Sequence, residues 1–275
     1  MADIITAFFS TPILLRALIV GVLVSLCAAL LGVSLVLKRY SMIGDGLSHV
    51  GFGALAIAAV MNWAPMAVAI PVVIAAAFLL LRLSGNGKIK GDSAIALIST
   101  GALAIGVMAV SLSGMNSDLD SYLFGSIYAI SDEDVVISVV VALLVLVLFI
   151  FFYTKIFAIT FDENFARATG TRAGTYNMLI ALLTALTIVI GMRMMGSMLI
   201  SSLIIFPALC SMRVFRSFRA VTICSAVISV VTFLVGMVIS YELGTPGGAS
   251  IVCVNIAAFA GFSAVGAVLR RNRAS

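Results

Sequence analysis

The chain has 275 residues, of which 63% are hydrophobic and only 10% are charged, and its mean hydropathy is +1.27. This composition excludes a water-soluble enzyme or binding domain, because too few polar residues are available to cover a surface in water. The net charge of +5 therefore indicates a topological bias across a lipid bilayer and not binding to nucleic acid.

The N-terminal segment, residues 1–10, carries Asp3 and no lysine or arginine, so it lacks the basic region of a cleavable signal peptide. Nine apolar runs follow, each close to the length of a membrane-spanning helix. They cover residues 12–37, 42–62, 65–83, 93–113, 135–158, 174–192, 195–212, 220–240 and 248–269. The run at 195–212 is short and contains Pro207, so we expect eight or nine spans. The sequence predicts an all-α, polytopic transmembrane helical bundle, with residues 1–275 forming one integral-membrane domain.

The basic residues predict the orientation, because cytoplasmic loops are enriched in lysine and arginine. With nine spans and the N-terminus outside, 14 of the 16 basic residues fall on the cytoplasmic side, and only Arg16 and Arg193 fall near the outer side. The same topology places the segment 114–134 outside, where it carries five acidic residues and no basic one. Such a segment could concentrate cations at an outer mouth, or it could simply be a solvated loop.

Asp45 and His49 are the most informative residues, since a charged group inside a membrane span is a candidate functional site. They are four residues apart, which places both side chains on one face of a helix. If that helix begins just after Lys38 and Arg39, His49 lies about 15 Å along it, near the middle of the bilayer. Carboxylate and imidazole groups are ligands of zinc, manganese and iron, and the sequence does not choose between these metals.

One chain supplies too few further ligands to complete a metal site. A two-fold dimer would bring together two copies of Asp45 and two of His49, giving four ligands around the axis. The alternative is structural: His49 is a core histidine hydrogen-bonded to Asp45, and the flanking glycines only let helices approach each other.

Four segments, in this order, resemble the ABC-3 family of metal-ion permeases, and the resemblance covers nearly the whole chain. They are KRYSMIGDGLSHVGFGA at 38–54, DSYLFGSIYAIS at 120–131, FDENFARATG at 161–170 and GSMLISSLIIFP at 196–207. The resemblance implies a type II ABC importer fold, a homodimer, a separate cytoplasmic ABC ATPase and an extracytoplasmic metal-binding protein as donor. It also implies a bacterial inner-membrane location and metal coordination by Asp45 and His49. The cargo would be Zn²⁺ or Mn²⁺, with no permanently bound cofactor.

A predicted cytoplasmic loop contains helix-forming residues of mixed charge, followed by Gly170 as a helix C-cap. By the resemblance, this loop is the coupling element that docks into the ATPase, although it could also be an ordinary interfacial loop. Its candidate residues are Phe161, Asp162, Glu163, Phe165, Ala166, Arg167 and Gly170. The chain itself has no phosphate-binding loop, so ATP hydrolysis requires a separate subunit and the chain is not expected to be an enzyme.

Two other classes fit less well. A secondary transporter driven by protons or sodium is expected to carry several intramembrane acids, and this chain has essentially one. An intramembrane metalloprotease needs two histidines in its zinc motif, and His49 is the only histidine. The methionines at 192, 194, 195 and 198 could bind a soft metal but are better explained as core filler. Ser201 and Ser202 could line a path or satisfy backbone carbonyls freed by Pro207.

Overall fold

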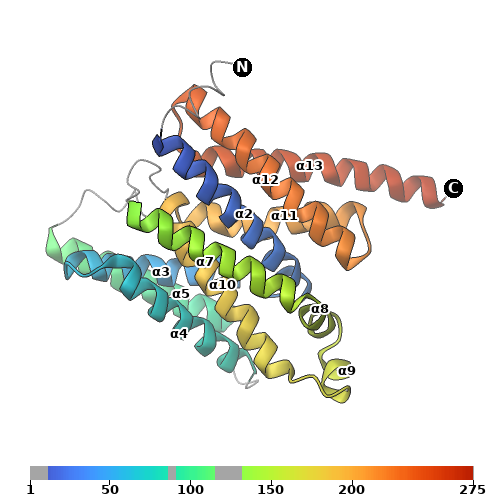
Figure 1. Cartoon of the computed structure of the whole chain (residues 1–275), viewed down its shortest axis with the longest axis horizontal. Coiled ribbons are helices and arrows are strands. Elements are labelled where there is room, and N and C mark those ends of the chain that lie inside the picture. The colour runs from blue at the N-terminus through green and yellow to red at the C-terminus, as the bar shows by residue number, and fades with distance from the viewer. Residues whose placement is uncertain (1–11, 86–90, 115–131, 275) are drawn as a thin grey trace.

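The structure is a computed structural model that describes residues 12–85, 91–114 and 132–274. The regular structure in these ranges is helical, and nine of the helices are long and apolar enough to cross a membrane (Figure 1). The helices are α2 (Pro12–Leu37), α3 (Ile43–Val60), α4 (Pro65–Gly85), α5 (Gly91–Ser113), α7 (Asp132–Phe151), α8 (Tyr153–Phe161), α9 (Glu163–Ala168), α10 (Ala173–Met195), α11 (Ser197–Val214), α12 (Phe218–Leu243) and α13 (Gly247–Ala274). The predicted transmembrane helical bundle is confirmed.

The count of nine spans holds because α11 is a continuous helix of 18 residues through Pro207. Proline removes one backbone donor from the helix and frees a carbonyl in the preceding turn. The hydroxyl of Ser211 donates to the carbonyl of Pro207 at 2.8 Å, which shows that side chains in this helix do bond its backbone. The break that the sequence did not predict lies elsewhere: the expected span 135–158 ends at Phe151, and a separate short helix, α8, follows.

Helix α2 is the central element of the bundle and packs against α7, α10, α11 and α12. A glycine makes the closest of these contacts possible. A Cβ atom on Gly32 would lie only 2.0 Å from the backbone oxygen of Ile204 on α11, so no side chain fits between the two helices there. The backbones of α2 and α11 therefore meet directly.

Ion pairs mark both ends of α2. Near its N-terminus Arg16 pairs with Asp132 at the start of α7, and just beyond its C-terminus Lys38 pairs with Glu163 of α9. Arg16 and Lys38 are 22 positions apart, which corresponds to about 33 Å of helix and matches the thickness of a hydrocarbon core. In Figure 1 α9 lies at the end of the bundle where α7 ends and α10 begins.

The second arginine assigned to the outer side also has an acidic partner. Arg193, near the end of α10, donates to Asp134 of α7 at 2.9 Å, and both side chains are largely buried. Two of the three described acids of the predicted mouth, Asp132 and Asp134, are thus engaged in ion pairs with Arg16 and Arg193. Asp118 and Asp120 lie outside the described residues.

Candidate functional site

Asp45 and His49 lie in the first two turns of α3, with His49 Nε2 3.6 Å from Asp45 Oδ2. The prediction that both side chains share one helix face is confirmed. Helix α3 begins at Ile43, within one residue of the predicted span 42–62, and not directly after Arg39 as the depth estimate assumed. Arg39 adopts a left-handed conformation with φ 61°, and Tyr40 N–H donates to the carbonyl of Leu35, so these residues form the turn that ends α2.

The pair lies within the candidate span formed by α3. Gly44 on α3 and Gly32 on α2 both contact Ile204 of α11, Gly44 at its side chain and Gly32 at its backbone oxygen. His49 is the seventh residue of α3, so it lies about 9 Å along a helix of 18 residues that is about 27 Å long. Asp45 and His49 therefore lie in the first half of this span.

Glycines on both sides of Asp45 fit α3 between its neighbours. A Cβ on Gly44 would lie 3.0 Å from a side-chain atom of Ile204 on α11, and one on Gly46 would lie 2.5 Å from Ile95 on α5. These contacts bring α3 close to α5 and α11 and leave the carboxylate between them. The glycines of this motif thus position Asp45 and do not bind anything themselves.

The rest of α3 is closed to solvent around this pair. From Ile43 to Ala56, Asp45 and His49 are the two residues that are not buried. Their side chains are 42% and 27% exposed, respectively. All other residues of α3 from Ile43 to Ala56 are buried, so this part of the helix presents one carboxylate and one imidazole to an open face of the chain.

Helix α11 adds a third polar group. The hydroxyl of Ser201 lies 3.4 Å from Asp45 Oδ1 and also 3.2 Å from the carbonyl oxygen of Ser197 in its own helix. Ser201 thus faces the carboxylate and bonds the carbonyl of Ser197, which is not the carbonyl four residues before Pro207 that the proline frees, so neither role expected for this serine is tested. The next residue, Ser202, accepts a 3.0 Å hydrogen bond from Asn255 of α13, which is fully buried.

Sequence reasoning missed Asn255. Its signal was a single amide within the apolar run 248–269, where an unpaired polar group is unfavourable. In the structure its Nδ2 joins α13 to α11 beside the polar turn of Ser201, while its Oδ1 is buried without a hydrogen-bond partner in the described part of the chain. Asn255 thus extends the polar region from α3 through α11 to α13.

The donor geometry suits one metal ion between Asp45 and His49. Two ligand bonds of about 2.1 Å at a tetrahedral angle separate their donor atoms by about 3.4 Å, and an octahedral right angle separates them by about 3.0 Å. The measured 3.6 Å between Nε2 and Oδ2 is close to the tetrahedral value. Over the described ranges, however, no group of three or more His, Cys, Asp or Glu residues could hold a metal ion.

The second ring nitrogen of His49, Nδ1, is buried and has no hydrogen-bond partner among the described residues. In most metal sites this nitrogen donates to a carboxylate, a backbone carbonyl or water, which fixes the ring. The described part of one chain therefore presents a carboxylate, an imidazole and a hydroxyl here, which are too few to complete a coordination shell.

The methionine cluster fills space beside glycines. The methyl group of Met192 would lie 2.5 Å from a Cβ on Gly51, and that of Met195 would lie 2.7 Å from a Cβ on Gly21. Met192 and Met195 are buried, whereas Met198 is about half exposed. These contacts support core packing, as methionine fits irregular gaps between helices.

The predicted coupling segment forms α9, a short helix with well-defined ends. Asp162 is its N-cap and accepts a 2.9 Å hydrogen bond from the backbone N–H of Phe165. Gly170 has φ 84° and lies just after the C-cap, so its predicted capping role is confirmed. The N–H groups of Gly170 and Thr171 donate to the carbonyls of Arg167 and Ala166.

Most of this segment faces outward. Phe161 and Phe165 are 60% and 66% exposed, and Arg167 is exposed beside them, whereas Ala166 is buried. Large apolar side chains at such exposure, next to charged ones, are typical of a protein-interaction surface. Asp162 and Gly170 thus shape the segment, and the two phenylalanines form its apolar surface.

Glu163 points the other way, toward the bundle. Its carboxylate accepts hydrogen bonds from Arg167 at 2.6 Å, Asn177 at 3.1 Å and Lys38 at 3.4 Å. Burial raises the pKa of this carboxyl, but the hydrogen bonds from Asn177 and Arg167 and the charges of Lys38 and Arg167 outweigh it, so the pKa is lowered overall. Glu163 is therefore held as a carboxylate.

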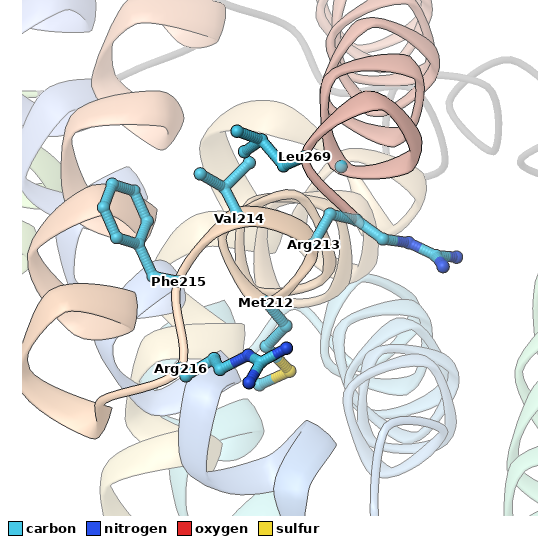
Figure 2. A pocket seen from close by; sticks show the side chains of 7 residues that line it. Met212, Arg213, Val214, Phe215, Arg216 and Leu269 are labelled. Atoms are coloured by element: carbon cyan, nitrogen blue, oxygen red, sulfur yellow. The ribbon is translucent and has the colours of Figure 1, made fainter. Parts of the chain in front are cut away.

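A separate small cavity of about 60 Å³ lies between the ends of α11 and α13. It is lined by Met212, Arg213, Val214, Phe215, Arg216, Gly266 and Leu269. Figure 2 shows the guanidinium of Arg216 beside Met212, while Arg213 extends to the other side of α11, where it stacks over Phe259 at 5.3 Å. A lining with two cations and no acid does not suit a divalent metal ion.

Comparison with known proteins agrees with this architecture. Residues 10–266 match the ABC 3 transport family. The manganese import system permease protein ScaB of Streptococcus gordonii is 28% identical, over 89% of this chain and 88% of that protein. The high-affinity zinc uptake system membrane protein ZnuB of Haemophilus influenzae is also 28% identical, over 87% of this chain and 92% of that one.

A solved structure is similar over almost its full length. The PsaBC complex from Streptococcus pneumoniae, solved with a Fab, contains a chain that matches with a TM-score of 0.85 and 28% identity. The match covers 95% of this chain and 94% of the other. The helical arrangement described above is therefore shared with a solved structure.

Proposed function

Because the chain belongs to the ABC 3 transport family, in which it is a membrane permease of the manganese and zinc type, we propose that it imports a divalent metal ion with energy from a separate ATPase. The observation that carries the proposal is the open polar turn of α3. Asp45 and His49 are its two accessible residues between Ile43 and Ala56, they lie inside the membrane span, and their donor atoms are 3.6 Å apart.

Asp45 and His49 bind the cargo during its passage. The carboxylate and the imidazole replace part of the hydration shell of the ion, which compensates for the loss of water in a region of low dielectric constant. Ser201 orients the carboxylate of Asp45 from the side of α11. This use of a polar group explains why a charged residue is kept in a membrane helix.

The second half of the coordination shell comes from a second copy of the chain. A two-fold contact that places the open faces of two α3 helices together supplies two carboxylates and two imidazoles. The incomplete ligand set of one chain supports this arrangement, since the described residues hold no third acid, cysteine or histidine near the pair. Four nitrogen and oxygen ligands are sufficient for Zn²⁺ and leave positions for water on Mn²⁺.

The transport cycle is alternating access. An extracytoplasmic binding protein releases the ion into an outward-open path, and the ion is held by Asp45 and His49. An ABC ATPase binds the coupling segment through Phe161 at the end of α8 and Phe165 of α9, whose exposure supports this contact. ATP binding and hydrolysis then open the path toward the cytoplasm of a bacterial cell, and this chain performs no covalent chemistry.

Metal titration of the purified permease tests the ligand assignment. Zinc or manganese is titrated into the wild type, Asp45→Ala and His49→Ala, with Asp92→Ala as a control because Asp92 is an exposed acid in the first turn of α5. We expect both site variants to lose more than about tenfold in affinity, because each removes a direct ligand. Equal affinity in the wild type and Asp45→Ala would refute the assignment.

A further inference from the structure

A partly buried polar cluster connects α9 to the rest of the bundle through Glu163, which lies between the exposed Phe161 and Phe165 in the chain. Lys38, just beyond α2, donates to Glu163 of α9 at 3.4 Å and also to the amide oxygen of Asn177 on α10. Asn177 in turn donates to Glu163 at 3.1 Å. Each of the three side chains therefore contacts the other two.

This cluster provides the polar connection between α9 and its neighbours. The other hydrogen bonds of α9 that the described residues show stay within the segment 162–171, such as the 2.6 Å pair between Arg167 and Glu163. Glu163 alone reaches other helices. Any displacement of α9 must consequently either carry Lys38 and Asn177 with it or break this cluster.

Lys38 is held tightly in this position. Its side chain is 9% exposed, and burial lowers its pKa although Glu163 acts in the opposite direction. It lines a cavity of only about 20 Å³, together with Tyr40, Ile43 and Asn177 among others. A buried ammonium group with two acceptors has little freedom to move independently of them.

Lys38 lies close in the chain to the proposed metal ligands, and Asn177 is connected to them through the length of α10. Lys38 precedes the start of α3 by five residues and Asp45 by seven. Asn177 is in the second turn of α10, and α10 is joined through Gly196 to α11, which carries Ser201. The cluster thus links α9 to both helices that contribute side chains to the polar turn.

We propose that Lys38 and Asn177 are positioning residues for transport, which act through Glu163 to transmit displacement of α9 to the metal ligands at the start of α3. The inference rests on the proposed function and extends it, because it names the connection between the ATPase-binding helix and Asp45. The cluster holds no cargo and binds no nucleotide. Its effect is on how many ions are moved for each ATP hydrolysed.

The test uses the complete importer in proteoliposomes, with ATP hydrolysis and uptake of labelled zinc or manganese measured in the same vesicles. Lys38→Met removes the cation that joins α9 to the start of α3. We expect the uptake per ATP to fall at least fivefold while ATP hydrolysis stays within twofold of the wild type. Lys155→Met is the matched control, because Lys155 is an exposed lysine of α8 outside the cluster, so the ratio should stay unchanged.

A double variant distinguishes two reasons why Lys38→Met could lower the uptake per ATP: loss of the connection that transmits the motion of α9, or destabilisation by the unpaired charge of Glu163. Lys38→Met leaves Glu163 without its buried partner, whereas Lys38→Met with Glu163→Gln removes both charges and restores a neutral interior. If the cluster transmits motion, the double variant regains thermal stability but not the uptake per ATP, and Lys38→Arg regains part of the ratio.

Two results overturn the inference: a wild-type ratio in Lys38→Met, or a wild-type ratio in the double variant. If the wild-type complex itself shows no ATP-driven uptake, the proposed function fails, and the inference fails with it. If the wild type transports and the variants match it, only the inference fails.

Discussion

Ser201 on α11 lies 3.4 Å from the carboxylate of Asp45 on α3, although 156 positions separate the two residues in the chain. The contact joins the short Gly-Asp-Gly turn of α3 to a serine whose hydroxyl also bonds its own helix at Ser197. Through this contact a side chain of α11 orients Asp45, which is the acidic residue of α3.

This contact predicts the effect of Ser201→Ala on metal affinity. Loss of an outer-shell hydrogen bond to a metal ligand typically weakens binding about 10–100-fold, and we expect a loss near the lower value because the 3.4 Å bond is long. Calorimetric titration with zinc and manganese measures it. Ser211→Ala is the matched control, since its hydroxyl bonds the backbone of the same helix far from Asp45. Equal losses in both variants would contradict the role of Ser201.

Helix contact at Gly32 predicts a stability difference between two glycine variants. Gly32→Ala places a methyl group 2.0 Å from the backbone oxygen of Ile204, whereas Gly101→Ala has no atom within 4 Å. We expect Gly32→Ala to destabilise the protein by about 2 kcal/mol or more through overpacking, and Gly101→Ala to leave stability unchanged or slightly raised. Unfolding in detergent by SDS or heat compares them. Similar stability in both variants would show that α2 and α11 separate easily.

The two outer ion pairs predict unequal effects of removing their acids. Asp134 and Arg193 are 10% and 22% exposed, whereas Asp132 and Arg16 are 74% and 41% exposed. Asp134→Asn leaves a largely buried arginine without its counter-charge and should destabilise by about 2 kcal/mol. Asp132→Asn should change stability by about 0.5 kcal/mol or less, since exposed pairs contribute little. The same unfolding assay measures both, and an equal effect would refute the distinction.

The lowered pKa of Glu163 predicts a pH-dependent contribution to stability. A carboxyl whose pKa is lower in the folded chain than its usual 4.5 stabilises the fold above pH 4.5, and this stabilisation is lost as the pH falls through the folded value. The wild type should therefore be more stable than Glu163→Gln at pH 7, and the difference should shrink below pH 4.5. Thermal unfolding of both proteins from pH 7 to pH 3.5 checks the sign. A difference that grows on acidification would contradict it.

The N-cap of α9 predicts different outcomes for two substitutions of Asp162. Asp162→Ala removes the acceptor for Phe165 N–H and should cost about 1 kcal/mol of local helix stability, whereas Asp162→Asn retains an acceptor oxygen. Amide hydrogen exchange in α9 should be about fivefold faster in the alanine variant and nearly unchanged in the asparagine variant. Equal exchange rates in the two variants would mean that tertiary contacts, and not the cap, hold α9.

The sequence predicted the features that depend on local spacing. Apolar runs gave the nine spans, and the separation of four residues placed Asp45 and His49 on one face. It did not predict the end of the fifth span at Phe151, because the residues that follow include enough apolar side chains to continue the run, although α8 is less apolar than α7 and contains Lys155.

Contacts between distant segments were beyond the sequence for a related reason. Lys38 and Glu163 are 125 positions apart, and the sequence assigned Lys38 only as a cytoplasmic charge and Glu163 only to the coupling segment. The hydroxyl of Ser201 and the amide of Asn255 gain their meaning from the crossing of α11 with α3 and α13, which no single-helix pattern specifies.

The isolation of the polar turn in α3 has a consequence for leakage. Past Asp45 and His49, a bare cation or a proton finds no other accessible polar side chain on this helix before Ile57. A chain of polar side chains along α3 is therefore interrupted beyond His49. Any continuous polar route past this point has to use groups of other helices, such as Ser201 on α11. Helix α3 itself thus offers protons and sodium ions a single polar step and no side-chain path along its length.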